Sequence, residues 1–182
     1  MGLRNRNLFK EKQCFFVTTS CHQGLHLFNS DSRKLIITQS LQFISEKYKI
    51  AILGCVIMPN HIHMIFWFKG GNVISDAMRD FKKFTSTVIR KDFEAKDEKE
   101  LLNRIKVNDK QIFRIWQERF DEVWIEDITL LEVKLNYIHL NPLQGHWNLE
   151  IIPENYTFSS AAFYQNGCGI PGLGLEDYRD YF

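Results

Sequence analysis

Two apolar runs separated by a short turn constrain the fold of this chain most strongly. The run from Ile50 to Ile57 is almost wholly apolar, as expected for a strand covered on both faces, and a second run extends from His61 to Lys69. Pro59-Asn60, between the two runs, is typical of a turn. Because the runs are so close in the sequence, we expect them to pair as a β-hairpin.

Two histidines one residue apart open the second run, in the sequence Met58-Pro59-Asn60-His61-Ile62-His63. Successive side chains of a strand point to opposite faces, so His61 and His63 project from the same face. Imidazole is the commonest metal ligand, and two imidazoles on one face are able to ligate one ion. The same pattern also occurs as an ordinary surface or partly buried pair, so the pair alone leaves both interpretations open.

The rest of the chain alternates between strand and helix patterns. A strand is predicted over residues 13–20, a helix from Ser30 or Asp31 to about Tyr48, a helix from the Gly70-Gly71-Asn72 break to about Phe93, and a strand over residues 112–120. In this last segment Trp116 and Arg119 are candidates for ligand contact or for packing, and core packing is the prediction for Trp116.

A late helix is framed by Thr129 and Pro142. Thr129 and Glu132 fit a capping box, while Pro142 cannot continue a helix and disfavours helical geometry at Asn141. Tyr137 and Asn141 are four residues apart, so they share a face if Asn141 still belongs to the last turn. Taken alone, Tyr137 is also explained as a packing aromatic, and Asn141 as a residue that ends a helix.

Length and composition suit one domain spanning residues 1–182. The chain is 45% hydrophobic and 14% aromatic, which is ample material for a core. Within this domain we distinguish a basic arm (1–12), a charged insertion or linker (94–111) and a C-terminal tail without an assigned role (165–182). The four cysteines are scattered without a Cys-x-x-Cys pair, so we expect no zinc cluster and no disulfides.

The charge distribution is more informative than the net charge of +1. Basic residues gather within 1–12 and within 79–91, where they are suited to contact phosphates or simply form a solvated helix face. No apolar run is long enough to span a membrane, and the N-terminus lacks an apolar stretch of signal-peptide length. We therefore predict a cytoplasmic protein that has no membrane partner.

The segment Met58 to His63, taken together with Asn136-Tyr137-Ile138-His139-Leu140-Asn141-Pro142, resembles the single-tyrosine (HUH) transposases of small insertion sequences. It is most similar to the relatives called REP-associated tyrosine transposases. Trp116 to Phe120 and Tyr156 to Ser160 are supporting matches, so the resemblance spans roughly residues 10–164. It implies an α+β fold of the ferredoxin-like (RRM/palm-like) type, in which an antiparallel sheet has helices packed on one face.

Transferred residue by residue, the resemblance implies that His61, His63 and Asn141 are metal ligands and that Tyr137 is the nucleophile. The cofactor would be a divalent metal, Mg²⁺ or Mn²⁺, and the imidazole ligands favour Mn²⁺ in vitro. Asparagine followed by proline matches the REP-associated branch, whereas many insertion-sequence relatives have glutamine there. Gly145-His146-Trp147 departs from the arginine-alanine-glycine run of many relatives, so a phosphate contact by that arginine is missing.

The resemblance also implies the chemistry. Attack by tyrosine leaves a covalent 5′-phosphotyrosine and a free 3′-hydroxyl, which keeps the energy of the cut bond for strand transfer. A phenol with a pKa of about 10 is mostly protonated at neutral pH and needs assistance. Lys134, one turn before Tyr137, is either a source of that assistance or incidental, and His139 lies on another face and receives no role.

Three functions compete on this evidence. The leading hypothesis is a metal-dependent transposase that nicks and transfers single-stranded DNA at hairpins or repeats. The second is a non-catalytic module or repressor that binds DNA hairpins and retains the fold, and the third is a metal-dependent hydrolase in which water replaces Tyr137. Relatives include dimers that exchange the tyrosine helix and members that act as monomers, so a monomer and a homodimer both stay open.

Overall fold

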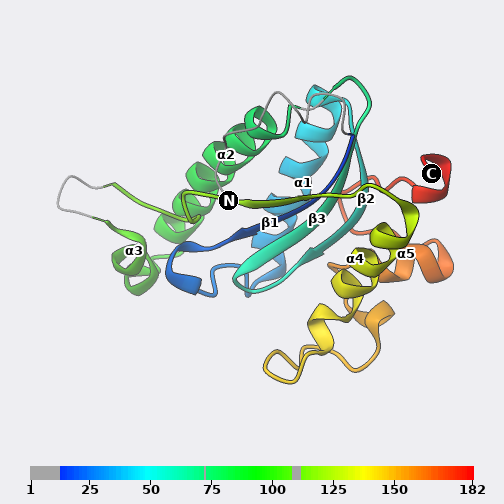
Figure 1. Cartoon of the computed structure of the whole chain (residues 1–182). Helices are drawn as coiled ribbons and strands as arrows, with labels where there is room; N and C mark the ends of the chain where they lie inside the picture. The colour runs from blue at the N-terminus through cyan, green and yellow to red at the C-terminus, as the bar shows by residue number, and fades with distance from the viewer. Residues whose placement is uncertain (1–12, 72, 108–111) are drawn as a thin grey trace.

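A four-stranded antiparallel sheet, in the order β2-β3-β1-β4, forms the centre of the computed structural model (Figure 1). The structure describes residues 13–71, 73–107 and 112–182. The strands are β1 (Cys14–Ser20), β2 (Ile50–Ile57), β3 (His61–Phe68) and β4 (Asp121–Trp124). The helices are α1 (Asp31–Tyr48), α2 (Ile74–Ala95), α3 (Lys99–Ile105), α4 (Ile128–Leu140) and α5 (Ala161–Asn166). The predicted α+β fold is confirmed.

The two faces of the sheet are covered differently. Helices α1 and α2 lie side by side behind the sheet in Figure 1, whereas α4 lies on the opposite face, near β2. Along β3, Ile62, Met64, Phe66 and Phe68 are fully buried on the α1 and α2 side, while the two histidines project to the α4 side. The alternation of β3 therefore separates the core from the face that carries the candidate site.

The predicted hairpin is confirmed, since β2 pairs with β3 along its whole length. A register shift occurs between Ile52 and Gly54, and every residue of β2 is buried. On the free edge of β2, Ile57 N donates to Phe158 O at 2.9 Å, and Tyr156 Oη donates to Ile57 O at 2.8 Å. The Tyr156 to Ser160 segment thus covers this edge and satisfies its backbone polar groups.

The predicted strand over residues 112–120 is wrong, because β4 begins only at Asp121. Within residues 112–120 the chain forms only isolated bridges, between Trp116 and Cys21 and between Phe113 and Lys106. Trp116 packs in the core and donates from Nε1 to Thr85 Oγ1 at 2.9 Å, as predicted for its packing role. The segment packs onto α2 and meets the end of β1 through hydrogen bonds from Gln117 N to Ser20 O and from His22 N to Ile115 O, but it does not form a continuous strand.

Two details of the late helix also differ from the prediction. The capping box is wrong, because α4 is capped by Asp127, whose carboxylate accepts from Leu130 N at 2.8 Å. Asn141 has helical dihedral angles (φ −57°, ψ −45°) despite Pro142, since Asn141 starts a 3-10 turn, Asn141–Leu143, whose first turn tolerates a proline. The helical path therefore continues far enough to keep Tyr137 and Asn141 on one face.

The predicted basic arm lies outside the described residues, as does part of the charged insertion (108–111). Within the insertion, α3 is a short helix that follows α2. In the second basic stretch, Lys82 donates to the backbone carbonyls of Gln117 (2.8 Å) and Arg119 (3.0 Å), and Arg90 pairs with Glu94. At least part of this stretch therefore serves the fold.

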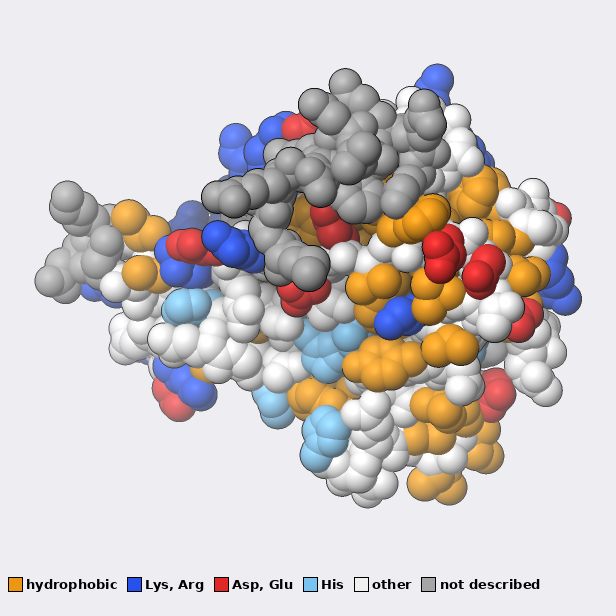
Figure 2. All heavy atoms as spheres, viewed as in Figure 1, with side chains coloured by type: hydrophobic (Ala, Val, Ile, Leu, Met, Phe, Trp, Pro, Cys, Tyr) orange, Lys and Arg blue, Asp and Glu red, His pale blue; other side chains and the backbone are white. Residues whose placement is uncertain are grey.

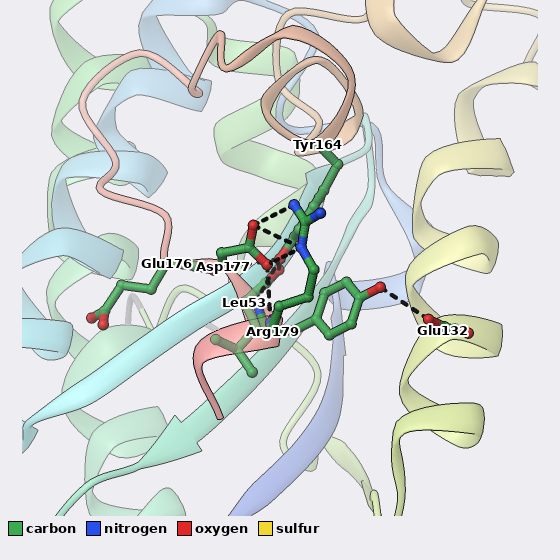
Figure 3. Close-up of polar contacts among 7 residues, drawn as sticks. Leu53, Glu132, Tyr164, Glu176, Asp177 and Arg179 are labelled. Carbon is green, nitrogen blue, oxygen red and sulfur yellow. Dashed lines mark hydrogen bonds and ion pairs between the residues drawn. The ribbon is translucent and has the colours of Figure 1, made fainter. Parts of the chain in front are cut away.

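The C-terminal residues pack along the edge of the sheet and against α4 (Figure 3). Glu176 N donates to Ile52 O at 3.1 Å, and Tyr164 Oη donates to Leu53 O at 2.6 Å. Tyr178 Oη then donates to Glu132 Oε1 of α4 at 2.9 Å. The segment predicted as a tail thus connects β2 to the tyrosine-bearing helix.

Cys14, Cys21 and Cys55 are buried, Cys168 is exposed, and all four are free thiols. Burial raises the pKa of the Cys14 thiol to about 12, so this thiol is protonated at neutral pH. Across the described residues, no helix combines the length and apolar character needed to cross a bilayer.

Candidate active site

The histidine pair lies at the start of β3, on the face that α4 covers. The ring centroids of His61 and His63 are 4.7 Å apart. His63 is buried and stacks on the Phe16 ring of β1, with 5.3 Å between the ring centroids. The strand alternation predicted from the sequence therefore brings the two imidazoles into contact.

Each imidazole is oriented through its Nδ1 atom. Thr18 Oγ1 lies 2.8 Å from His63 Nδ1, and Asn60 Oδ1 lies 2.6 Å from His61 Nδ1. Because the Asn60 oxygen only accepts, His61 Nδ1 carries the proton and its Nε2 keeps a free lone pair. Partners of this kind, on the nitrogen that does not bind metal, orient metal-ligating histidines.

Both rings are uncharged at neutral pH. Burial lowers the pKa of His63 to about 3, with further lowering by His61 and Lys134. Burial also lowers the pKa of His61 to about 4, where Asn141 opposes the effect and His146 adds to it. A neutral imidazole is the form that ligates a metal, so the pair needs no proton loss before binding.

Asn141 brings an amide oxygen to the same place. Its side chain neighbours His61, and it is 2% exposed. Among the described residues, Asn141 Oδ1 is buried without a hydrogen-bond partner, which is costly for a polar atom. A cation ligated by Asn141 Oδ1 would remove that cost, so the donor set fits a divalent metal.

This donor set is two imidazoles and one amide oxygen. Within the described part of the chain, no cluster of three or more His, Cys, Asp or Glu side chains able to hold a metal occurs. Three neutral donors leave coordination positions open for other oxygen ligands. The set therefore differs from a closed structural zinc site, which uses four protein ligands.

Tyr137 projects from α4 toward the histidines. Its ring lies edge-on to the His63 ring, with 5.1 Å between the centroids, and 6.1 Å from the Phe16 ring. The side chain is 44% exposed, so it is accessible to a large substrate. Lys134, one turn earlier, has its Nζ atom 5.0 Å from the centre of the Phe16 ring. A phenol, an ammonium group and two imidazoles therefore share one surface.

Close packing holds α4 against the sheet. A Cβ atom added to Gly54 would lie 2.8 Å from Leu135 Cδ1 and 3.5 Å from Ile138 Cδ1, so the helix fits only because glycine has no side chain. His139, to which the sequence assigned no role, is joined through Nε2 to Ser160 Oγ at 3.0 Å. The packing of α4 on the sheet thus determines where Tyr137 lies.

Sequence reasoning missed several supporting residues of the site. Thr18 was predicted only as part of a strand and Ser160 only as part of a supporting match, because both approach the site from segments distant in the sequence. Asn60, directly before His61, belongs to the recognised motif but was interpreted only as a turn residue. Trp147 lies beside His61, with 5.7 Å between the ring centroids.

The site opens on one face of the molecule. In Figure 2, histidine side chains gather in the middle and lower part of this face, beside hydrophobic side chains. The four residues singled out from the sequence, His61, His63, Tyr137 and Asn141, lie around this surface.

The chain was compared with protein families, curated proteins and solved structures. The model of the family "Transposase IS200 like" matches residues 16–141. A solved structure of a REP-associated tyrosine transposase bound to a REP hairpin superposes with a TM-score of 0.68 and 19% identity, covering 97% of this chain and 93% of that chain. A structure named "putative transposase" from Deinococcus radiodurans has a TM-score of 0.45 and 14% identity, covering 76% of this chain and 95% of that chain. No curated protein matches the sequence.

Proposed function

Because this chain belongs to the IS200-like transposase family, we propose that it nicks single-stranded DNA and transfers the strand through a covalent bond to Tyr137. In this proposal His61, His63 and Asn141 hold a divalent metal ion, Mg²⁺ or Mn²⁺. The substrate is hairpin or repeat DNA with an unpaired flank. The proposal is supported by a solved relative of the same fold, which is bound to a REP hairpin.

One observation carries the proposal more than any other. The exposed phenol of Tyr137 lies against His63, while the buried amide oxygen of Asn141 lacks a partner in the described chain and neighbours His61. A purely structural asparagine would leave that oxygen at a cost of about 1–3 kcal/mol. A bound cation explains the asparagine, the two neutral imidazoles and the nearby tyrosine together.

The nucleophile is the Tyr137 oxygen. It attacks the scissile phosphorus, a Tyr137 O–P bond forms, and the P–O3′ bond breaks to leave a 3′-hydroxyl. The phenol loses its proton, and the departing 3′-oxygen takes one up. A second 3′-hydroxyl then attacks the phosphotyrosine, which rejoins the strand and releases Tyr137.

The surrounding residues favour this attack in two ways. Lys134 places positive charge near His63 and the Phe16 ring, on the surface from which Tyr137 projects, so it would attract a phosphate of the substrate strand. Packing of α4 on β2 limits the movement of Tyr137, which keeps the reacting atoms close. The metal, when bound, would polarise the non-bridging phosphate oxygens.

Tyr137 and the histidine pair come from one chain in the described structure. We therefore propose that cleavage proceeds in cis and that a monomer is sufficient. Exchange of α4 between two chains would have to break its contacts with Gly54 and Ser160.

The test uses purified protein, Mn²⁺ and a labelled hairpin oligonucleotide with an unpaired flank. We expect a slower band on a denaturing gel from wild-type protein, and no such band from Tyr137→Phe or after chelation, while Tyr137→Phe still binds the DNA. Tyr48→Phe is the matched control, because Tyr48 lies on α1 and hydrogen bonds to Asp80.

The same gel separates the competing functions. Cleavage that survives Tyr137→Phe would identify a hydrolase that uses water. Hairpin binding without any cleavage by the wild-type protein would identify a binding module or repressor. A covalent adduct formed by Tyr137→Phe would refute the assignment of the nucleophile.

A further inference from the structure

Trp147 lies at the centre of a group of aromatic rings beside the candidate metal site. Its ring centroid is 5.7 Å from that of His61, 5.3 Å from that of His26 and 5.3 Å from that of His146. Trp147 is half-buried, whereas His26 and His146 are exposed. Aromatic surface therefore extends without a break from a predicted metal ligand to solvent.

The loop that carries Trp147 is held in place by its own backbone. Trp147 N donates to Gln144 O at 2.7 Å, and Leu149 N donates to Pro142 O at 2.9 Å. The loop directly follows Asn141, so the position of the indole is linked to that of the candidate metal ligand. A ring fixed in this way loses little conformational entropy when a ligand stacks on it.

A cavity of about 580 Å³ adjoins the ring group, and His26 belongs to both. Arg33 lines this cavity and is already paired with Asp92, at 2.8 Å, and with Glu98. Arg104 lines it as well, is exposed, and has no ion pair within the described part of the chain. The cavity therefore offers one cation that a phosphate is free to use.

We propose that Trp147 and His26 form a stacking site for an unpaired nucleobase that flanks the cleaved bond, and that Arg104 contacts the phosphate backbone of the same strand in the adjoining cavity. The proposal rests on the proposed DNA-cleaving function and adds a substrate site to it. The ligand class is a nucleic-acid single strand, which combines exposed base faces with regularly spaced phosphates, and the proposed function makes that strand DNA.

Stacking explains features that simple packing does not. Core packing accounts for part of the Trp147 side chain, which lies against the hydrophobic core, but it does not account for the three histidine rings that neighbour the indole. Stacking on indole tolerates any base, so this site would position the strand without reading its sequence. Readout of the target sequence would then fall to other contacts.

The test measures binding apart from cleavage. The cleavage-deficient Tyr137→Phe protein is titrated with a fluorescent DNA hairpin whose unpaired flanking nucleotides are replaced one at a time by abasic sites. We expect one position at which the abasic change weakens binding by about 10-fold or more. Adding Trp147→Ala should weaken binding to the intact strand by a similar factor and remove the sensitivity at that position.

Four further variants keep the test decisive. Trp147→Phe retains an aromatic face and should preserve most of the sensitivity. His26→Ala should reduce the sensitivity, and it changes an exposed residue, so it decides the matter if Trp147→Ala fails to fold. Leu149→Ala changes the same loop without removing an aromatic ring and should leave the binding profile unchanged. Arg104→Ala should reduce the affinity by the same factor for every abasic oligonucleotide and should make binding less dependent on salt concentration.

The inference would be overturned if the effect of each abasic position on binding were the same with and without Trp147, at equal protein stability. It would also be overturned if the affinity did not depend on the unpaired flank at all. Adduct formation by the protein with Tyr137 intact is scored separately. If the adduct forms but the effect of the abasic positions does not depend on Trp147, the stacking site is refuted and the cleavage proposal stands. A Trp147-dependent profile without any adduct supports the stacking site and defeats the cleavage proposal.

Discussion

His139 Nε2 and Ser160 Oγ are joined by a hydrogen bond of 3.0 Å between α4 and the segment that covers the edge of β2. Ser160 Oγ also accepts from Cys55 N at 3.1 Å, and Ser160 N donates to Cys55 O at 2.8 Å. The helix that carries Tyr137 is thereby tied to the sheet two residues beyond the tyrosine. We infer that His139 is a positioning residue.

His139→Ala should lower the rate of DNA cleavage more than it lowers affinity for DNA. Loss of the bond to buried Ser160 should cost about 1–3 kcal/mol of folding free energy, and a small displacement of Tyr137 should reduce cleavage by about 10- to 100-fold. Single-turnover cleavage and hairpin binding measure the two effects. His139→Gln, which keeps a hydrogen-bonding side chain, should recover most of the rate; equal losses in rate and affinity would contradict a positioning role.

Gly54→Ala should push α4 away from the sheet, because the added Cβ would lie 2.8 Å from Leu135 Cδ1. Overpacking of this kind costs about 1–3 kcal/mol, and cleavage should fall with it. Adding Leu135→Val, which shortens the obstructing side chain, should restore part of both. Gly70→Ala is the control, since a Cβ there meets nothing within 4 Å. Full activity of Gly54→Ala would show that this close approach is dispensable.

Mn²⁺ should raise the melting temperature of the wild-type protein. A ligand that binds only the folded state at 100 times its Kd stabilises it by about 2.7 kcal/mol, which corresponds to a shift of about 5–10 °C for a chain of this size. His63→Ala and Asn141→Ala should lose most of this shift, whereas His22→Ala, in the turn after β1, should keep it. A shift that persists when His61 and His63 are both replaced would place the metal elsewhere.

Lys82→Ala should destabilise the fold through the loop that precedes β4. Lys82 Nζ donates to Gln117 O at 2.8 Å and Arg119 O at 3.0 Å. Hydrogen bonds from a charged group are worth about 1.5–3 kcal/mol, so the melting temperature should fall by about 3–10 °C. Lys83→Ala, at the next position of α2, should have little effect by thermal denaturation. Equal melting temperatures for the two variants would assign Lys82 to the surface.

Local patterns in the sequence were enough to predict most of the main elements, and the resemblance of two motifs indicated the family. The hairpin of β2 and β3 follows from two apolar runs and a turn. Helix α1 follows from Ser30 or Asp31 at its start and helix α2 from the preceding glycine break, each together with helical spacing. The residues of the candidate site were predicted from the resemblance to tyrosine transposases, whereas a strand or a helix by itself determines only which of its own side chains share a face. His61 with His63 and Tyr137 with Asn141 are such pairs, and their catalytic and metal-binding roles stay predictions.

Local patterns could not predict contacts between segments that are distant in the sequence. The strand predicted over residues 112–120 is wrong, because this segment only bridges the end of β1 at Trp116, whose ring packs on α2. Thr18 beside His63, Ser160 beside His139 and His26 beside Trp147 are likewise products of folding. The sequence alone specifies the chemistry of each side chain and the face of the strand or helix on which it lies. Only the folded structure brings the histidine pair and Tyr137 together, through the packing of α4 over Gly54. Burial and distance depend on contacts between segments that are far apart in the sequence.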